Sequence, residues 1–386
     1  MSDEVVNATG KNGMQSVQSK TTLFASPSSW IEGESLRQLE RAAELPGMVR
    51  VAGFPDLHPG KGGPVGAAML SEEILYPYLV GSDVGCGMAL FATELRADKA
   101  KPEKWAKKLC GLEEAWDGDT ESWLTERGVQ LNNFATSVGT IGMGNHFAEL
   151  LRVQNVEDDI ALESLGIDET LLAMLVHSGS RGLGQSLLRS HTDRFKDAGL
   201  DKDSEEANAY LLRHNNAIAW ATANRELIAC RFLEQLTSYY RRIIDVTHNS
   251  VTLVNLDGTP CFLHRKGAAP SDQGAVIIPG SRGTLSYLVM PTGDQSQNLW
   301  SVAHGAGRKW GRNECEGKLR GRYSAESLRK TKLGGYIICE DKDLLYEEAP
   351  QAYKDIDSVI ADMVGFGLIK VVATFAPILT YKVREK

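Results

Sequence analysis

The residues of this chain that could bind a metal ion are spread over much of its length, and that spread limits the folds open to it. Asp83 and Cys86 share one glycine-rich turn, and His146, His177 and His248 follow in separate segments. Carboxylate, thiolate and imidazole groups are common metal ligands in proteins. If these side chains form one site, distant segments must come together, which favours a single interwoven α+β domain over two independent domains.

Cys86 alone has an ordinary interpretation, because a free cysteine in a glycine-rich turn is usually a small buried hydrophobic residue. The three histidine segments favour a metal site instead. One metal ion usually takes four protein ligands or fewer, so a larger set with a bridging thiolate indicates two metals with positions left open for substrate. Ligand softness alone favours Zn²⁺ or Fe²⁺. Two open metals suit phosphoryl chemistry, because they can hold the attacking and the leaving oxygen.

Composition indicates a soluble protein with reduced cysteines. Of the 386 residues, 42% are hydrophobic and 24% are charged, as in ordinary globular proteins, and no apolar run is long enough to span a membrane. Residues 1–28 are polar and carry Asp3 and Glu4 where a secretory signal would be positive, so we expect a flexible N-terminal arm and one domain at 29–386. The six cysteines form no Cys-x-x-Cys pair, which indicates a cytoplasmic protein.

The charge distribution is uneven along the chain. A formal net charge of −8 argues against general affinity for nucleic acid. Residues 308–332, however, contain nine lysines and arginines against three glutamates. Such a segment can be an ordinary solvated face, but its position directly after His304 favours contact with nucleic acid.

The apolar pattern predicts a mixture of helices and strands without an internal repeat. Asp83 and Cys86 are expected on a turn between two strands within 79–95, and His177 directly after an apolar strand at 171–176. His146 follows a glycine loop, where a helix start is expected. The other expected elements are a helix at 29–45, strands at 49–54 and 66–70, a rigid loop at 55–64, one or two helices at 207–240, short strands from 243 to 290, a strand at 336–339, a helix at 350–366 and a strand at 371–383.

His304 lies in a loop with Gly305 and Gly307 and is followed by Arg308. A single histidine in such a loop is more often a turn or packing residue. Alternatively it is a nucleophile, with Arg308 neutralising a phosphate. The upstream segment 279–286 offers glycine amides and hydroxyl groups that could hold a nucleotide, although it lacks the P-loop pattern.

Eight ordered motifs between about Leu36 and Lys382 resemble the RtcB family of RNA ligases, also called tRNA-splicing ligases. They are Asp-x-x-Cys-Gly at 83–87, Gly-Asn-His-Phe at 144–147, His-x-Gly-Ser-Arg-Gly at 177–182, Asp-Val-x-His-Asn at 245–249, His-Arg-Lys-Gly at 264–267, Ile-Pro-Gly-Ser at 278–281, His-Gly-Ala-Gly-Arg at 304–308 and Glu-Ala-Pro-x-Ala-Tyr-Lys-Asp-Ile-Asp at 348–357.

The resemblance implies a single RtcB-like α+β domain with a β-rich core and surrounding helices. It also implies a GTP- and Mn²⁺-dependent RNA ligase. Such an enzyme joins RNA ending in a 3′-phosphate or 2′,3′-cyclic phosphate to RNA with a 5′-hydroxyl, in tRNA splicing or RNA repair. His304 would form a histidine–GMP intermediate. An activating protein partner is compatible with this interpretation, and a membrane is not expected to take part.

The same resemblance assigns roles to individual residues. Cys86 would bridge two Mn²⁺ ions, with Asp83 and His146 completing one site and His177 and His248 the other. Arg181 and Arg308 would hold phosphates or RNA ends. The positions that match the guanylate pocket are Asn145, Phe147, Glu149, Ser281, Ser286, Ala306, Gly307, Tyr353 and Lys382.

Three residues depart from the family pattern near the expected substrate path. Lys61 stands where an aromatic residue is usual, Arg282 where a methionine is usual, and Gly311 where a small hydroxyl residue is usual. They bear on the choice of substrate, not on the core chemistry. Two other functions are considered: an RNA-end hydrolase that opens cyclic phosphates but has lost ligation, and a non-catalytic RNA-binding factor. The intact His304 and the full set of matched guanine-pocket residues argue against the hydrolase, and the presence of every predicted metal ligand argues against the non-catalytic factor.

Overall fold

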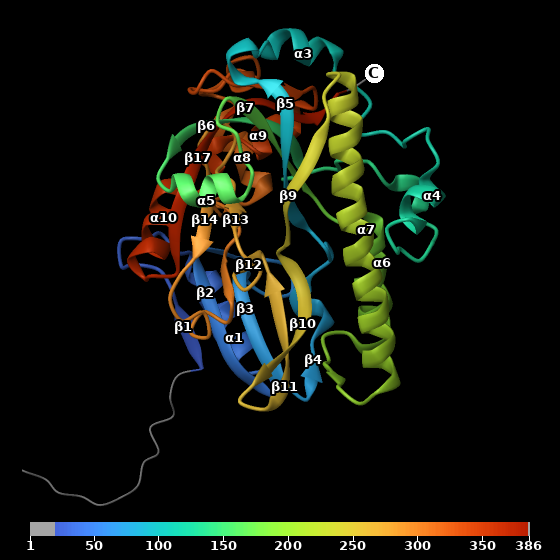
Figure 1. The fold of residues 1–386 in the computed structure, drawn as a ribbon. Coiled ribbons are helices and arrows are strands. Elements are labelled where there is room, and N and C mark those ends of the chain that lie inside the picture. Colours follow the sequence, from blue (N-terminus) through green and yellow to red (C-terminus); the bar gives the residue numbers. More distant parts are fainter. Residues whose placement is uncertain (1–19, 385–386) are drawn as a thin grey trace, which may run out of the picture.

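The computed structural model describes residues 20–384, and two antiparallel-rich sheets form the centre of this part of the chain (Figure 1). The strands are β1 (Thr21–Leu23), β2 (Met48–His58), β3 (Val65–Glu72), β4 (Ile74–Leu75), β5 (Gly87–Arg96), β6 (Phe147–Val156), β7 (Leu171–Ser178), β8 (Leu200–Asp201), β9 (Tyr240–Thr247), β10 (Asn249–Leu256), β11 (Thr259–Lys266), β12 (Ala268–Pro270), β13 (Val276–Ile278), β14 (Ser286–Pro291), β15 (Ser301–Ala303), β16 (Tyr336–Cys339) and β17 (Ile369–Val383).

Helices cover the outer faces of these sheets. The α-helices are α1 (Gly33–Ala43), α2 (Pro77–Val80), α3 (Pro102–Lys108), α4 (Thr120–Thr125), α5 (Asp159–Ser164), α6 (Gly182–Phe195), α7 (Glu205–Gln235), α8 (Arg312–Leu319), α9 (Lys342–Glu347) and α10 (Ile356–Gly365). The 3-10 helices are η1 (Ala97–Lys99), η2 (Ala135–Ser137), η3 (Ser327–Arg329) and η4 (Pro350–Ala352). The expected α+β class is confirmed.

The smaller main sheet has the strand order β1-β2-β3-β11-β10 and lies in the lower half of Figure 1. Helix α1 packs against it because its apolar positions fall on one side. Leu39 and Ala42 are buried there, in one cluster with Leu57 and Met69. Burying such an amphipathic stripe stabilises both the helix and the sheet beneath it.

The larger sheet has the order β13-β14-β17-β6-β7-β5-β9, and β16 pairs with the end of the 15-residue β17. The 31-residue helix α7 runs along one face of it (Figure 1). Ile228 and Phe232 of α7 belong to the buried cluster that holds Phe91 of β5 and Met174 of β7. The sequence predicted one or two helices here, and the structure has one.

The positions where strands begin and end place the candidate site. In an antiparallel pair, the start of one strand lies beside the end of its neighbour. Gly87 at the start of β5 pairs with Ser178 at the end of β7 and with Thr247 at the end of β9. Phe147 at the start of β6 pairs with His177. The segments that carry the candidate ligands therefore meet at one edge of the sheet.

Three local expectations need correction. The segment before the glycine-rich turn is helix α2, because Pro77 at its first turn favours a helix start. His146 precedes a strand, not a helix, since β6 begins at Phe147 and is held by pairing with β7. Strand β2 continues to His58 instead of ending before a loop at 55.

The predicted N-terminal arm at 1–28 is only partly within the described residues. Residues 1–19 lie outside them. Thr21–Leu23 forms β1, which pairs in parallel with Val51–Gly53 of β2, and Phe24 is buried with its ring 6.0 Å from that of Phe54. The folded part therefore begins before residue 29, because backbone pairing and an aromatic contact hold this segment.

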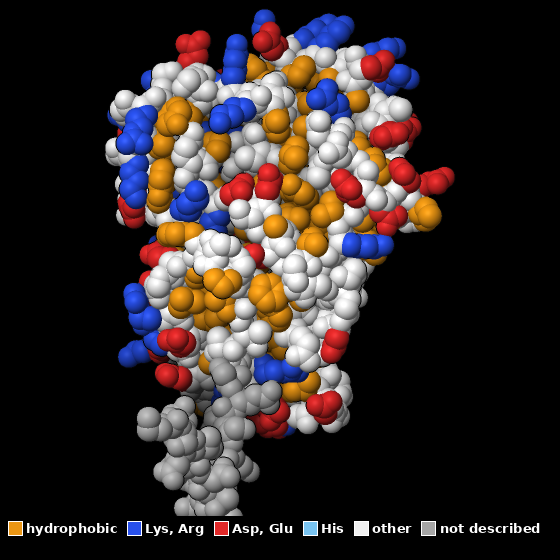
Figure 2. Space-filling view, turned by 90° about the vertical axis from the view of Figure 1, so that its left-hand side faces the viewer, with side chains coloured by type: hydrophobic (Ala, Val, Ile, Leu, Met, Phe, Trp, Pro, Cys, Tyr) orange, Lys and Arg blue, Asp and Glu red, His pale blue; other side chains and the backbone are white. Residues whose placement is uncertain are grey.

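The surface carries charges of both signs. On the face seen in Figure 2, lysine and arginine side chains gather along the upper rim and one edge, with acidic and hydrophobic side chains between them. No helix among the described residues has the length and apolar character needed to span a membrane. All six cysteines are free thiols.

Candidate metal centre and adjoining cavity

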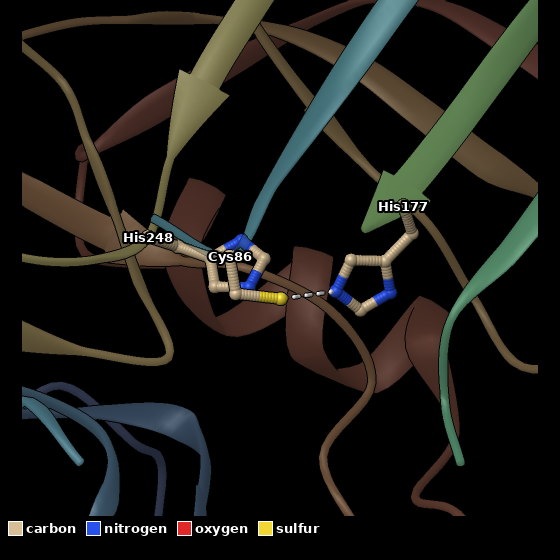
Figure 3. Close-up of side chains that lie close together, drawn as sticks. All are labelled: Cys86, His177 and His248. Atoms are coloured by element: carbon tan, nitrogen blue, oxygen red, sulfur yellow. Dashed lines mark hydrogen bonds between the residues drawn. The ribbon is translucent and has the colours of Figure 1, made fainter. Parts of the chain in front are cut away.

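Cys86 lies at the centre of the converging ligand candidates. Its Sγ atom is 3.2 Å from Nε2 of His177 and 3.3 Å from Nε2 of His146. The rings of His177 and His248 are 5.2 Å apart between centroids. Figure 3 shows Cys86, His177 and His248 pointing toward one another from the start of β5, the end of β7 and the segment after β9. All three are buried.

The candidate ligands form two groups that share the thiol. One group is Cys86, His177 and His248, and the other is Asp83, Cys86 and His146; within each, one ligand atom per residue lies within 4.8 Å of the others. Nε2 of His146 is 2.9 Å from Oδ2 of Asp83. This is the division in which a bridging thiolate would serve two metal ions.

The protonation of these groups fits metal binding. The carbonyl of Asn145 accepts from Nδ1 of His177 at 3.2 Å, which leaves Nε2 with its lone pair toward the thiol. Burial lowers the pKa of His177 and of His248 well below the usual range, so both imidazoles are neutral. Nδ1 of His248 is buried without a hydrogen-bond partner.

The thiol of Cys86 is in an environment that disfavours a free thiolate. Burial, followed by the charge of Asp83, raises its pKa well above the usual value. A divalent cation would reverse this, because it favours the thiolate and the carboxylate together. A donor set of one thiolate, one carboxylate and three imidazoles therefore fits two cations.

The buried side chain of Arg225 fixes the glycine-rich turn that carries Asp83 and Cys86. Nη1 of Arg225 donates to the carbonyls of Gly85 at 2.7 Å and Ser178 at 2.9 Å, and its guanidinium also pairs with Asp245. Gly85 has a φ of +81°, and a Cβ there would lie 2.8 Å from that of Ala221 on α7. The turn before Cys86 thus needs a glycine and is fixed to the end of β7.

His304 stands beside this centre with a defined tautomer. Its Nδ1 donates to Oδ2 of Asp56 at 2.7 Å, and the rings of His304 and His248 are 4.6 Å apart between centroids. Since a carboxylate only accepts, Nδ1 carries a proton, which leaves Nε2 as the ring nitrogen that could bond to a substrate. Asp56 is fully buried and also accepts from the backbone N–H of His304.

Lys354 fixes the backbone around Asp56. Its Nζ donates to the carbonyls of Pro55 at 2.8 Å and Leu57 at 2.7 Å, on either side of that aspartate. The backbone N–H of Lys354 donates to the carbonyl of Gly307 at 2.9 Å, in the loop that carries the histidine. Lys354 therefore fixes the position of Asp56 relative to the loop that carries His304.

A cavity of about 250 Å³ adjoins the metal centre and reaches His304. It lies between strands β6 and β17 and the loops at 279–282 and 304–308. Of the residues that matched guanylate positions in the sequence, those that line it are Asn145, Phe147, Glu149, Ser281, Ala306, Gly307, Tyr353 and Lys382. Ser286 does not; it is buried as the first residue of β14.

Comparison with known proteins identifies the family. The family model described as tRNA-splicing ligase RtcB matches residues 38–115 and 113–383. RNA-splicing ligase RtcB2 of Escherichia coli is 46% identical over 93% of this chain and 94% of its own length. The chain belongs to the RtcB family.

Other RtcB proteins are more distant but match over similar lengths. The tRNA-splicing ligase RtcB of Thermococcus kodakarensis is 27% identical over 90% of each chain. That of Nanoarchaeum equitans is 29% identical over 91% of this chain and 92% of its own. The family resemblance inferred from the motifs is thereby confirmed across the whole ligand-bearing region.

The two arginines expected to hold phosphates have protein partners in this RtcB-family chain. Nη1 of Arg181 donates to Nδ1 of His146 at 3.2 Å, which places it behind a candidate ligand. Arg308 donates to Trp310, Glu348, Tyr353, Glu347 and Cys315. An arginine has five N–H donors, so these contacts favour a structural role for Arg308 over a phosphate-binding one.

Sequence reasoning missed Asp56 and Glu348. The sequence predicts that Asp56 lies in a loop and gives it no role. An aspartate that is flanked by apolar residues and shielded from water needs a hydrogen-bond or ion-pair partner, however. Glu348 is buried in the cavity wall and faces Arg308 at 3.1 Å, Arg312 at 3.6 Å and Lys382 at 3.9 Å. Its place at the start of the Glu-Ala-Pro motif was the available signal.

The three departures from the family pattern lie in different surroundings. Lys61 is exposed, and its carbonyl accepts from Nζ of Lys266 at 2.6 Å. Gly311 is the N-cap residue of α8. Arg282 lines the cavity, so it is the departure with direct access to a ligand there.

Proposed function

We propose that this chain is a GTP- and Mn²⁺-dependent RNA ligase that works through a His304–GMP intermediate. The observation that carries the proposal is the position of His304. It lines both the cavity that holds the matched guanylate residues and the hollow around Asp83, Cys86, His146 and His248. A nucleophile there would have a nucleotide on one side and, on the other, the residues that would hold two metal ions.

His304 is prepared for attack on the α-phosphate of GTP. Its Nε2 would form the bond to phosphorus while the bond to the pyrophosphate oxygen breaks, and pyrophosphate would leave. Asp56 keeps Nδ1 protonated and stabilises the positive charge that develops on the ring. GMP would then pass to the RNA 3′-phosphate, and the 5′-hydroxyl of the second RNA would displace GMP to form the phosphodiester.

The ligand groups around Cys86 support two metal ions in this reaction. Bound Mn²⁺ would neutralise phosphate charge and orient the attacking and leaving oxygens. Manganese is inferred from the family resemblance, since ligand softness alone would favour zinc or iron. Glu149 and Lys382 also line the cavity, and in this proposal they would read the N–H groups and O6 of guanine.

RNA as substrate is supported by the names of the relatives and by the charge of one segment. Several relatives are named RNA-splicing or tRNA-splicing ligases, so tRNA processing or RNA repair in the cytoplasm is the proposed setting. The basic segment 308–332 begins at the histidine loop. Part of its charge is neutralised by ion pairs within the segment, such as Lys318–Glu314 and Arg320–Glu316.

The decisive measurement is an intact mass spectrum after incubation with Mn²⁺ and either GTP or ATP. We expect one added GMP with GTP only, and no adduct in His304→Ala. Asp56→Asn keeps the size of the side chain but loses the carboxylate, so adduct formation should slow by about 100-fold. An unmodified protein despite bound Mn²⁺ would contradict the ligase, and cyclic-phosphate RNA processed only to 3′-phosphate would support the hydrolase instead.

A further inference from the structure

A second pocket, larger than the cavity at His304, lies between the start of helix α3 and the turn that leads into β16. Its volume is about 580 Å³, against about 250 Å³ for that cavity. Its lining includes Lys101 and Lys104 from the first of these segments and Lys330 and Tyr336 from the second. It shares no lining residue with the cavity or with the hollow around the metal ligands. This pocket is therefore a separate candidate binding site.

Three lysines give this pocket a positive charge that the protein does not neutralise. Lys101, Lys104 and Lys330 are exposed, and among the described residues their ammonium groups have neither an ion pair nor a hydrogen bond. Glu103 is the one acidic side chain in the described lining. Three lysines against one glutamate leave the lining at +2, in a chain whose formal net charge is −8. Positive charge that stays unpaired favours an anionic ligand.

The charge comes from two basic segments that are far apart in the sequence. Residues 99–108 contain five lysines against one glutamate, and residues 329–332 end the basic segment 308–332 with three cations. Helix α3 contacts β16 and crosses the top of Figure 1, and basic side chains gather along the same upper rim in Figure 2. Like charges that the fold brings together repel one another, so a bound anion would stabilise this arrangement.

The backbone on the β16 side of the pocket is fixed without a ligand. Lys330 pairs with Tyr336 in an antiparallel bridge, and the N–H of Gly335 donates to Oγ1 of Thr331 at 2.8 Å. A Cβ on Gly335 would lie 2.6 Å from the carbonyl oxygen of Pro377, so this turn lies directly against β17. Tyr336 is half-buried and packs against the core cluster beneath it. A site that is already formed loses less entropy when a ligand binds.

The chemistry and the position of the pocket favour RNA as the anion. Lysines beside an aromatic residue are typical of surfaces that bind single strands, because cations meet the phosphates and rings meet the bases. The pocket also lies near the cavity. Tyr336 pairs with Leu379 of β17, and the next residue of that strand, Thr380, lines the cavity. Adjacent strands are about 5 Å apart, so an RNA whose end is at His304 has this pocket within its length.

We propose that this pocket binds the phosphate backbone of the RNA substrate away from the reacting end. Lys101, Lys104 and Lys330 would contact phosphates, and Tyr336 would lie beside a base. The inference rests on the proposed function and deepens it, because it assigns a site that holds RNA outside the site of chemistry. Phosphate contacts position a nucleic acid without reading its sequence, so the pocket would accept RNAs of many sequences.

The test is the binding of a fluorescent single-stranded RNA of about 20 nucleotides, measured by anisotropy from about 0.05 to 0.3 M salt. The RNA ends in a 3′-hydroxyl and the buffer lacks Mn²⁺ and GTP, so neither end can react. Lys101→Gln/Lys104→Gln should bind about tenfold more weakly than the wild-type chain. Its slope of log affinity against log salt should fall by about 1.4, which is about 0.7 for each lost phosphate contact. Lys330→Gln, from the other segment, should lower the slope by about 0.7.

A matched control removes the same charge from the same helix. Lys107 and Lys108 are exposed on α3 but do not line the pocket. Lys107→Gln/Lys108→Gln should therefore change the affinity by less than about twofold, since distant charges are screened by salt. Glutamine and lysine have similar helix propensities, so Tm should stay the same in both double variants. Equal losses of affinity in the two pairs would reflect general attraction and would overturn the inference.

An acidic protein segment is the competing partner, and a poly-glutamate peptide with the same charge as the RNA tests it. The wild-type chain should bind this peptide more weakly than the RNA. Tighter binding of the peptide, lost in Lys101→Gln/Lys104→Gln, would make the pocket a protein-docking site and overturn the inference. No RNA binding by a wild-type chain that still forms the GMP adduct would overturn this inference alone. Absence of both would overturn the proposed function as well.

Discussion

At the scale of single residues, the site depends on buried charges whose partners are specific. Glu149 is 5% exposed, bonds to the hydroxyl of Thr380 on the neighbouring strand and faces Lys382. Burial raises its pKa to about 7, although Thr380 and Lys382 act in the opposite direction. Near neutral pH this carboxyl therefore exchanges between a neutral and a charged form, and each form has a different hydrogen-bonding capacity.

This pKa gives a prediction about stability. The unfolded chain releases the Glu149 proton near pH 4.5, and the folded chain holds it to about pH 7. The contribution of this group is therefore greatest below pH 4.5 and is lost as pH rises to about 7. Glu149→Gln should remove a pH dependence of about 3 kcal/mol. Urea unfolding of the wild-type and Glu149→Gln proteins at pH 5 and pH 8 measures how the free energy of unfolding changes with pH. The same change in both proteins would contradict the raised pKa of Glu149.

At the scale of elements, helix α7 carries polar groups to the back of the metal centre. Arg225 ties the turn before β5 to the end of β7. Asn224 beside it donates to the hydroxyl of Ser178 at 3.1 Å and accepts from the N–H of Gly139 at 2.7 Å. The helix was predictable from its length and apolar positions, but its buried arginine was not. Only the sheet pairing reveals which carbonyls face that helix.

The role of Arg225 can be tested by Arg225→Met. The change leaves Asp245, whose side chain is only 11% exposed, without its partner and two carbonyls without donors, so the free energy of unfolding should fall by about 3–5 kcal/mol. Mn²⁺ affinity should fall about 10- to 100-fold, because the ligand loop loses its support. Arg213→Met changes an exposed arginine of the same helix and should shift stability by no more than about 0.5 kcal/mol. Equal effects of the two variants would remove the case for a supporting role.

At the scale of the whole molecule, the sequence predicted that one domain would have to gather the ligands, and it named the residues that do converge. It did not predict Asp56, because nothing local shows that a strand end will reach the His304 loop. The order of the strands in the sheets could not be predicted from the sequence either. Strand β17 pairs with β6 and β14, which are far away in the chain, and such long-range pairing leaves no periodic signal.

Metal binding should stabilise the domain as a unit, because the ligands come from several distant segments. At 100 times its Kd, Mn²⁺ adds about 2.7 kcal/mol, which raises Tm by about 3–5 °C in a chain of this size. Cys86→Ser removes the shared ligand of both groups and should abolish most of this shift. Differential scanning fluorimetry with and without Mn²⁺ provides the measurement. An undiminished shift in Cys86→Ser would place the bound metal elsewhere.

The central place of β17 has a consequence for synthesis. This strand is translated after every other strand of the larger sheet, yet it lies between β14 and β6. Until it emerges from the ribosome, the sheet is divided into two parts with open edges, and Lys382 is missing from the cavity. A message cut short before this segment would therefore yield a chain that cannot close its sheet, and such open edges invite aggregation or degradation. The enzyme can become active only from an RNA that was read through to this strand.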